Sequence, residues 1–240
     1  MKTQVSKYLF LIVQLILYGL FLVLDFLGSN ITLSSRIKFL VVVLCFLYVV
    51  YGKNEGGRQR KILTYAMAFT VISDIYLLFT DDYFNGLVTF VITQQLYGVR
   101  IKQLYNREST NNQKNPLKSF AIRVTMQIVA SVILSVLLWQ MGIILNSLLV
   151  ASMVYVVSLV TNVVGSIRLS ISFPKRKDVR LFTIGLILFF LCDINVGLFN
   201  MSSFIDVGSV YKYIYNISSI LMWTFYAPSQ VMIALSKDIN

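Results

Sequence analysis

Long apolar stretches set the strongest limit on what this chain can fold into. Eight of them, each close to the roughly 20 residues that cross the hydrocarbon core of a bilayer, alternate with short polar breaks. Lipid offers no hydrogen-bond partner to a backbone amide, so only helices and closed barrels span it. Runs this long lack the short alternating pattern of barrel strands. We therefore expect an all-α, polytopic (multi-pass) transmembrane helix bundle in a single domain, residues 1–240, with eight spans at 8–27, 37–52, 62–80, 83–103, 120–141, 143–165, 180–200 and 210–235.

The amino-acid composition excludes a water-soluble domain. Hydrophobic residues make up 57% of the chain and charged residues 13%, whereas a soluble domain carries roughly 25% charged residues. The net charge of +11 would suit nucleic acid, but the basic residues fall in short clusters between apolar runs and form no binding stripe. Histidine is absent, which excludes imidazole metal sites and His-activated nucleophiles. We expect no metal, no cofactor and no nucleic-acid partner.

Basic residues also predict how the bundle is oriented. When alternate segments are grouped, only Arg36, Lys38 and Lys212 of the 21 Lys and Arg residues fall on the side opposite to the others. Positive segments resist translocation, so the crowded side is expected to be cytoplasmic and both termini to lie there. The expected location is the cell (cytoplasmic) membrane. A polar loop at 105–119 joins two halves, 1–104 and 120–240, of four spans each.

Two carboxyls lie deep within predicted spans. Asp74 stands in the run VISDIYLLF of the third span, and Asp193 in the run FFLCDINVG of the seventh. An ionisable side chain costs free energy inside a membrane, so each is a candidate functional residue. Both lie equally far past a basic loop, which predicts a shared depth and a weak four-plus-four parallel repeat around one central cavity. Asp25, near the outer end of the first span, ranks lower.

Polar and aromatic side chains recur at helical spacing on three further spans and are expected to line that cavity. The fourth span carries Gly86, Phe90, Gln94 and Tyr97, the sixth Tyr155, Ser158 and Asn162, and the eighth Asn216, Ser219, Trp223, Tyr226 and Gln230. Such residues also serve simply as hydrogen-bond partners between helices. For the two Asp residues the corresponding alternative is a structural acceptor for a Tyr or Gln across the bundle.

At these residues the sequence resembles the YhhN-like lysoplasmalogenase family of eight-span membrane proteins. The resemblance rests on Ser73-Asp74 with Leu77, on Asp193 in the matching span, and on two patterned helices, namely Phe84, Gly86, Phe90, Gln94 and Tyr97, and Tyr226 with Gln230 before IALS. One position departs from the family. Where the family commonly has a His in the fourth span, this chain has Gln94, which cannot transfer a proton at neutral pH.

The resemblance implies hydrolysis of the vinyl ether bond of lysoplasmalogens, giving a fatty aldehyde and a glycerophospho-alcohol. Asp74 and Asp193 would be the catalytic pair, one protonated as the acid and the other ionised to stabilise the oxocarbenium ion and orient water. The substrate-binding residues, which position the head group or the water, would be Gln94, Tyr97, Asn216, Tyr226 and Gln230. The expected partner is a membrane lipid of the lysophospholipid type.

Two other functions explain the same carboxyls. A proton-coupled transporter or lipid-handling protein would use them between two pseudo-symmetric halves, and an assembly factor would use them to hold helices together. The cavity separates the three. One lateral opening with a closed inner end favours a lipid hydrolase, access from both faces favours transport, and the lack of a cavity favours the assembly factor.

Overall fold

The computed structural model describes residues 2–52, 57–108, 116–204 and 208–237. Over these residues the chain is helical and contains no strand, which confirms the all-α prediction. The long helices are α1 (Lys2–Leu27), α2 (Ile31–Tyr51), α3 (Gly57–Ile75), α4 (Tyr83–Glu108), α5 (Pro116–Gln140), α6 (Ser147–Ser172), α7 (Lys177–Phe199) and α8 (Tyr211–Leu235). The π-helical turn η2 (Tyr76–Thr80) prolongs α3, and the 3-10 turns η3 (Met201–Ser203) and η4 (Gly208–Val210) lie between α7 and α8.

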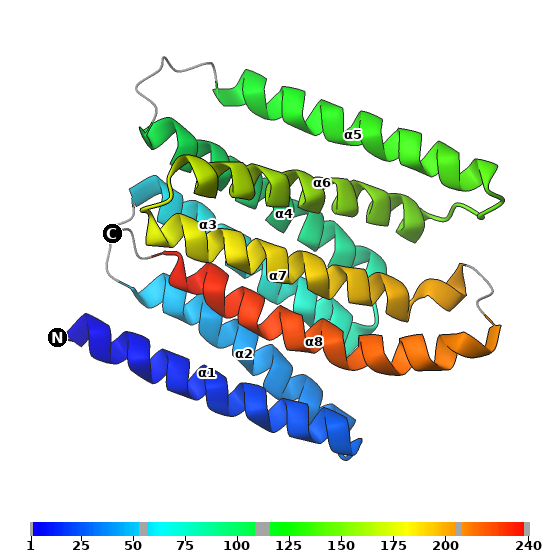
Figure 1. Ribbon diagram of the computed structural model, residues 1–240, viewed down its shortest axis with the longest axis horizontal. Coiled ribbons are helices and arrows are strands. Elements are labelled where there is room, and N and C mark those ends of the chain that lie inside the picture. Colours follow the sequence, from blue (N-terminus) through cyan, green and yellow to red (C-terminus); the bar gives the residue numbers. More distant parts are fainter. Residues whose placement is uncertain (1, 53–56, 109–115, 205–207, 238–240) are drawn as a thin grey trace.

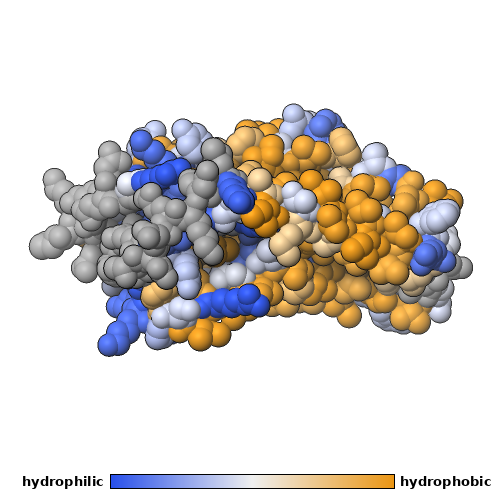
Figure 2. Space-filling model, turned by 90° about the horizontal axis from the view of Figure 1, so that it is seen from above, coloured by the Kyte–Doolittle hydropathy of each residue, from blue (hydrophilic) through white to orange (hydrophobic). Residues whose placement is uncertain are grey.

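The eight helices lie side by side, and α1 begins at the same end of the bundle at which α8 ends (Figure 1). We call this end, which carries Arg60, Arg100, Arg176 and Lys237, the basic end, and the opposite one the far end. Six helices are long and apolar enough to cross a membrane: α1, α2, α3 with η2, α5, α6 and α7. Hydrophobic side chains cover most of the visible length of the molecule, and hydrophilic ones gather toward the basic end (Figure 2). These features indicate an integral membrane protein.

The two remaining helices, α4 and α8, fall short in hydropathy because they carry the polar stripes. Their polar faces are instead buried against neighbouring helices. The most extensive helix pairs in the bundle are α3 with α4 and α7 with α8, so the polar faces of α4 and α8 turn toward protein. Gln94 on α4 and Gln230 on α8 are completely buried.

Several helix boundaries differ from the expected spans because capping residues, not apolar runs, set where a helix begins. α2 starts at Ile31 instead of residue 37, since the Asn30 side chain accepts a hydrogen bond from the backbone amide of Leu33 at 3.0 Å. α6 starts at Ser147 instead of 143, after a turn that contains Gly142 at a φ of +84°. The predicted loop 105–119 is shorter than expected. α4 continues to Glu108 and α5 begins at Pro116, and 109–115 lie outside the described residues.

Helix neighbours in the two halves correspond to one another. The pairs α1–α2, α2–α3 and α3–α4 are matched by α5–α6, α6–α7 and α7–α8, and α4–α6 is matched by α8–α2. Aligning Asp74 with Asp193 also places the buried positions of α3 on buried positions of α7, for example Ala66 on Gly185 and Ser73 on Cys192. The two halves therefore pack around each other by the same rules.

Candidate functional site

Asp74 is held in the core by a tyrosine from the last helix. It lies on α3 with only 3% of its surface exposed. The Tyr226 hydroxyl on α8 is 2.8 Å from both Asp74 carboxyl oxygens. Because α3 and α8 come from opposite halves of the chain, this contact ties the two halves together.

The backbone next to Asp74 departs from a regular helix. Directly after Ile75 the chain forms the π-helical turn η2, a feature that is rare and occurs frequently at functional sites. The Ser73 hydroxyl donates to the backbone carbonyl of Gly86 on α4. A Cβ at Gly86 would lie 2.7 Å from the Leu77 side chain. Close approach of α4 thus fixes the turn that follows Asp74.

Asp193 on α7 has a tyrosine partner of its own. The Tyr155 hydroxyl on α6 donates to Asp193 Oδ2 at 2.6 Å. Asp193 is half-buried, in contrast to Asp74. Tyr155, Cys192 and Tyr226 belong to one cluster of buried side chains, which places the two carboxyl–tyrosine pairs in one neighbourhood.

Aromatic rings fill the space between the two carboxyl–tyrosine pairs. Phe90 on α4 lies with its ring centroid 5.9 Å from Tyr155, 5.6 Å from Phe189 and 6.5 Å from Tyr226. Phe189 in turn contacts Tyr226 at 5.5 Å. The core at this depth is therefore one continuous aromatic cluster with a carboxyl on either side.

The depths of the two carboxyls match. Asp74 lies six residues before Thr80 and Asp193 six before Phe199, so each is about 9 Å from the far end of its helix. Two hollows in the described part of the chain lie along α5 and α6 and at the turn between them, and neither is lined by Asp74 or Asp193. At the level of the carboxyls, Phe90 packs between the rings of Tyr155 and Tyr226.

The other predicted site residues fall into two groups. Four are buried in the core below or beside the carboxyls: Gln94, Tyr97, Tyr226 and Gln230. Asn216 is exposed, one and a half turns into α8 from the far end, and the structure does not bring it to the others.

Gln94 belongs to the Asp193 side of the core. Asn162 on α6 donates to both the backbone and the side-chain oxygen of Gln94, at 2.7 and 2.8 Å, and Gln94 lies next to Tyr155. On the other side, the Gln230 amide donates to Ser229 at 3.3 Å and its oxygen has no partner in the described structure. Tyr97 points its hydroxyl toward the Met67 sulfur at 3.8 Å.

The basic end of the core is closed by hydrogen bonds to helix C-termini. Arg100 on α4 donates to the side chain and the carbonyl of Ser236 at 2.8 and 2.6 Å, and its guanidinium stacks 4.3 Å from the Phe182 ring. Arg60 donates to the carbonyls of Val49 and Val50, at the end of α2. Cations are stabilised at the carbonyl end of a helix, so Arg60 and Arg100 close the basic end of the core.

Two features of the site were not expected from the sequence. Asp25 forms an ion pair with Lys38 at 2.7 Å, and the Lys38 ammonium lies 4.8 Å from the centroid of Trp223, whose ring contacts Tyr226. Tyr155 was expected only as a cavity-lining residue and is the partner of Asp193. Its place on the polar stripe of the sixth span was the available signal. In the described residues no cluster of three or more His, Cys, Asp or Glu could hold a metal.

A comparison with known protein families identifies the family of this chain. The model of the YhhN family matches residues 33–237, which takes in both carboxyls, both tyrosines and all the helices that carry them. The chain belongs to the YhhN family. No curated protein and no solved structure matches it. Within this YhhN protein, the carboxyl–tyrosine pairs Asp74–Tyr226 and Asp193–Tyr155 are the polar centre of the matched region.

The YhhN domain of this chain carries its most polar motif twice. Phe90 is followed by Thr93 and Gln94 on α4, and Tyr226 by Ser229 and Gln230 on α8, with the same spacing. All six side chains are buried. Each motif thus presents an aromatic ring to the carboxyl level and a glutamine one turn closer to the basic end.

Proposed function

We propose that this protein hydrolyses an alkenyl ether bond in a lysophospholipid-type membrane lipid, as a lysoplasmalogenase-like enzyme. One observation carries the proposal: two carboxyls, each bonded to a tyrosine hydroxyl, flank one aromatic cluster and lie equally far from the ends of their helices. Membership of the YhhN family supports it. A carboxyl pair in a membrane core is costly, and a catalytic role explains why the cost is met.

The proposal includes a topology of eight spans with both termini in the cytoplasm, in the cell membrane. α4 and α8 count as spans because each lies along an apolar neighbour, α3 and α7 respectively. The basic end faces the cytoplasm because positive residues are retained there. Asp74 and Asp193 then lie in the outer half of the bilayer.

The chemistry needs one proton donor and one carboxylate. The acid protonates the alkenyl carbon remote from the ether oxygen, which leaves an oxocarbenium ion. Water adds to the carbon bearing the oxygen and loses its proton to the carboxylate. The hemiacetal that results breaks into a fatty aldehyde and the glycerophospho-alcohol, so one water is consumed. Two carboxyls in different surroundings can divide these tasks.

Because their surroundings differ, Asp193 and Asp74 make different contacts in the proposed reaction. Asp193 is half-buried and Tyr155 bonds only one of its oxygens, so Asp193 is the group that reaches the reacting atoms. The Tyr226 hydroxyl lies within hydrogen-bonding distance of both oxygens of the buried Asp74. Asp74 therefore acts on the substrate through the Tyr226 hydroxyl. Gln94, Tyr97 and Gln230 support this core from the basic side, and exposed Asn216 meets the polar head group.

The closed basic end limits the routes by which the substrate can enter. Hydrogen bonds of Arg100 and Arg60 seal the basic end. The lipid therefore enters from the side or from the far end, and the Phe90 ring moves aside to admit the alkenyl chain.

A turnover assay tests this function. The purified full-length protein in nonionic detergent is given an alkenyl lysophospholipid, and the released aldehyde is measured by mass spectrometry. We expect turnover by the wild type and none by D74N or D193N. The matched control is D81N, because Asp81 is exposed and has a φ of 53°, which Asn also adopts readily. No aldehyde from the wild type, or full turnover in both core variants, refutes the hydrolase.

The corresponding packing of the two halves favours a second function, a proton-coupled transporter or lipid-handling protein. Such a protein moves an unchanged lipid or solute, so it releases no aldehyde. Uptake into proteoliposomes that responds to a pH gradient, and is lost in D74N and D193N, would support it.

A further inference from the structure

A polar network lies at a distance from the carboxyls, where α5 meets α4 and α6. The Arg123 guanidinium on α5 donates to the Gln95 side-chain oxygen at 2.6 Å and to the Gln95 carbonyl at 3.1 Å. It also lies 3.5 Å from the side-chain oxygen of Asn162 on α6. Gln95 donates to Gln127 on α5 at 2.9 Å and to Ser158 on α6 at 3.0 Å. All these partners are uncharged.

The positive charge in this network has no counter-ion. No carboxylate in the described parts of the chain lies within ion-pair distance of Arg123, and its Nε has no hydrogen-bond partner. Lys102 follows Gly98 by one turn on α4, and its buried ammonium likewise lacks a partner. The Gln127 amide nitrogen is a third free donor in the same interface. Arg123 is half-buried and all its hydrogen-bond partners are neutral, so this interface offers two cations and free donors without a negative charge to balance them.

The backbone makes room for this cation. A Cβ at Gly98 would overlap the Arg123 guanidinium. In the other half, the alignment of Thr93-Gln94 with Ser229-Gln230 puts Ala234 in place of Gly98 and Val231 in place of Gln95. Packing alone does not require a glycine or a polar residue at these two positions, because the equivalent positions on α8 are Ala234 and Val231.

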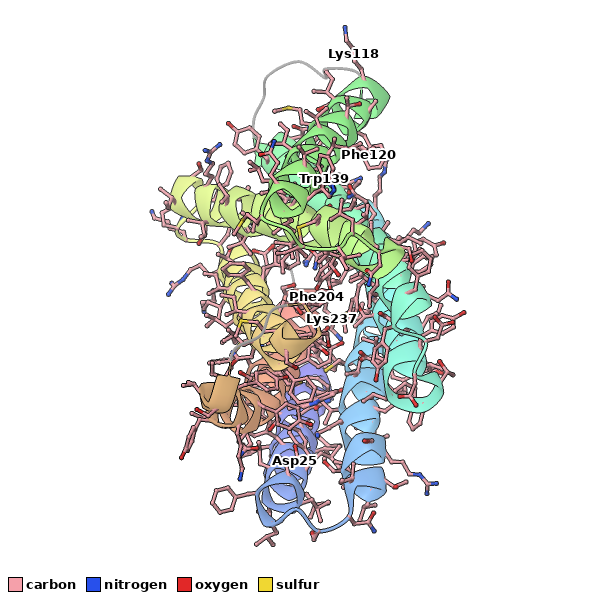
Figure 3. All side chains as sticks on the ribbon, turned by 90° about the vertical axis from the view of Figure 1, so that its right-hand side faces the viewer. Asp25, Lys118, Phe120, Trp139, Phe204 and Lys237 are labelled. Carbon is pink, nitrogen blue, oxygen red and sulfur yellow. The ribbon has the colours of Figure 1, made fainter. Side chains whose placement is uncertain are left out.

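The position along the helix indicates what kind of anion fits. Arg123 lies seven residues after Pro116, about 10 Å from the basic end of α5, at the level of lipid head groups and the adjoining hydrocarbon. α5 stands at the edge of the bundle (Figure 1), and Figure 3 shows Lys118 pointing away from the bundle at one end of α5. Basic pockets between helices on the cytoplasmic side bind anionic lipid head groups.

A groove continues from the network toward the far end. It has a volume of about 290 Å³ and is lined by residues of α5 between Ile128 and Trp139, by Leu145 before α6, and by Val150 and Val154 on α6. Its first residue, Ile128, follows Gln127 directly. An acyl chain whose head group is bound at Arg123 runs into this groove.

From this geometry we infer that the α4–α5–α6 interface binds the phosphate of an anionic phospholipid, with Arg123 and Lys102 as its cations. The site is separate from the carboxyl core and does not depend on hydrolase activity. Bound lipid holds α5, whose main helix contact is with α6, against the rest of the bundle.

Lipid binding to the purified full-length protein tests the inference. Phosphatidylglycerol is titrated into the delipidated protein in nonionic detergent, with native mass spectrometry and thermal unfolding as readouts. We expect bound lipid and a raised Tm. Diacylglycerol, which lacks the phosphate, should have no effect, and phosphatidylcholine a smaller one. An equal effect of inorganic phosphate at the same concentration would overturn the assignment to a lipid.

Variants locate the site. R123Q and K102Q should each weaken phosphatidylglycerol binding by about ten- to hundredfold, the range for losing a hydrogen bond to a charged group. G98A should weaken binding similarly by displacing the Arg123 guanidinium. It provides a second test of the site if R123Q does not fold. R168Q is the matched control, since Arg168 is an exposed cation on α6. Wild-type affinity in both R123Q and K102Q would refute the site.

Discussion

Asp74 and Asp193 occupy equivalent places in the two halves of the bundle, yet their surroundings differ. Asp74 is buried, both its oxygens are bonded by Tyr226, and its helix ends in a π-helical turn. Asp193 is half-buried, has one bonded oxygen and lies on a helix that stays regular to Phe199. Two halves with corresponding helix neighbours thus hold one closed and one accessible carboxyl. This asymmetry allows two chemically identical groups to perform different steps.

The largest expected effect is the loss of turnover when either carboxyl is removed, and chemical rescue compares the two sites. D74A and D193A should each lower turnover by about a thousandfold, within the range for general acid–base groups. Formate added at high concentration should restore part of the activity of D193A, because that site is half-open. It should not restore D74A, whose site is closed. Aldehyde release measures both, and equal rescue of the two variants would contradict the assigned difference.

Removal of the tyrosine hydroxyls compares the two sites by stability. Y226F leaves both oxygens of buried Asp74 without their donor, at a cost of about 2 kcal/mol. Y155F should cost under about 1 kcal/mol, since half-buried Asp193 can find another donor. Thermal unfolding in detergent distinguishes them, and a larger loss in Y155F would reverse the comparison.

Glycine substitutions probe the two helix ends. In G86A the new Cβ would lie 2.7 Å from Leu77 and 3.3 Å from Tyr76, so the packing of η2 must shift at a cost of about 1–3 kcal/mol. Gly197 on α7 has no atom within 4 Å of such a Cβ, and G197A is its control. A neutral G86A would show that the π-helical turn does not depend on close packing with α4.

The smallest expected effect concerns the departure from the family pattern. Q94H places an imidazole beside Tyr155 on the accessible side, and we expect turnover to rise by no more than about tenfold. Q230H puts the same group on the closed side, where Ser229 is the hydrogen-bonding partner, and should not raise turnover. A gain in Q230H alone would place the reacting atoms near Asp74.

Much of this arrangement follows from the sequence, because lipid imposes simple rules. Apolar length and the absence of barrel alternation predicted the all-α class, and the cost of charge in a membrane singled out Asp74 and Asp193. Boundaries such as the start of α2 at Ile31 depend on single capping atoms of Asn30, which hydropathy does not register. The partner of each carboxyl could not be predicted either. Tyr226 and Tyr155 are 152 and 38 residues away from their aspartates, and only the rotation of each helix about its axis brings them together.

The expected cavity illustrates a further limit. Helical spacing shows that Phe90, Gln94 and Tyr97 share a face, but it does not show whether that face borders empty space or other side chains. The rings of Phe189 and Tyr226 fill the region. Whether this face borders empty space depends on the side-chain volumes of four helices together. No single stretch of sequence contains that information.

The low hydropathy of α4 and α8 has a consequence for how the protein is made. A nascent segment enters the bilayer from the translocon according to its own apolar content, and these two segments are too polar to do so readily alone. Each follows a strongly apolar helix with which it forms an extensive pair. With α4 and α8 as spans, as proposed above, we expect each to enter the bilayer as a hairpin with the apolar helix before it, α3 or α7.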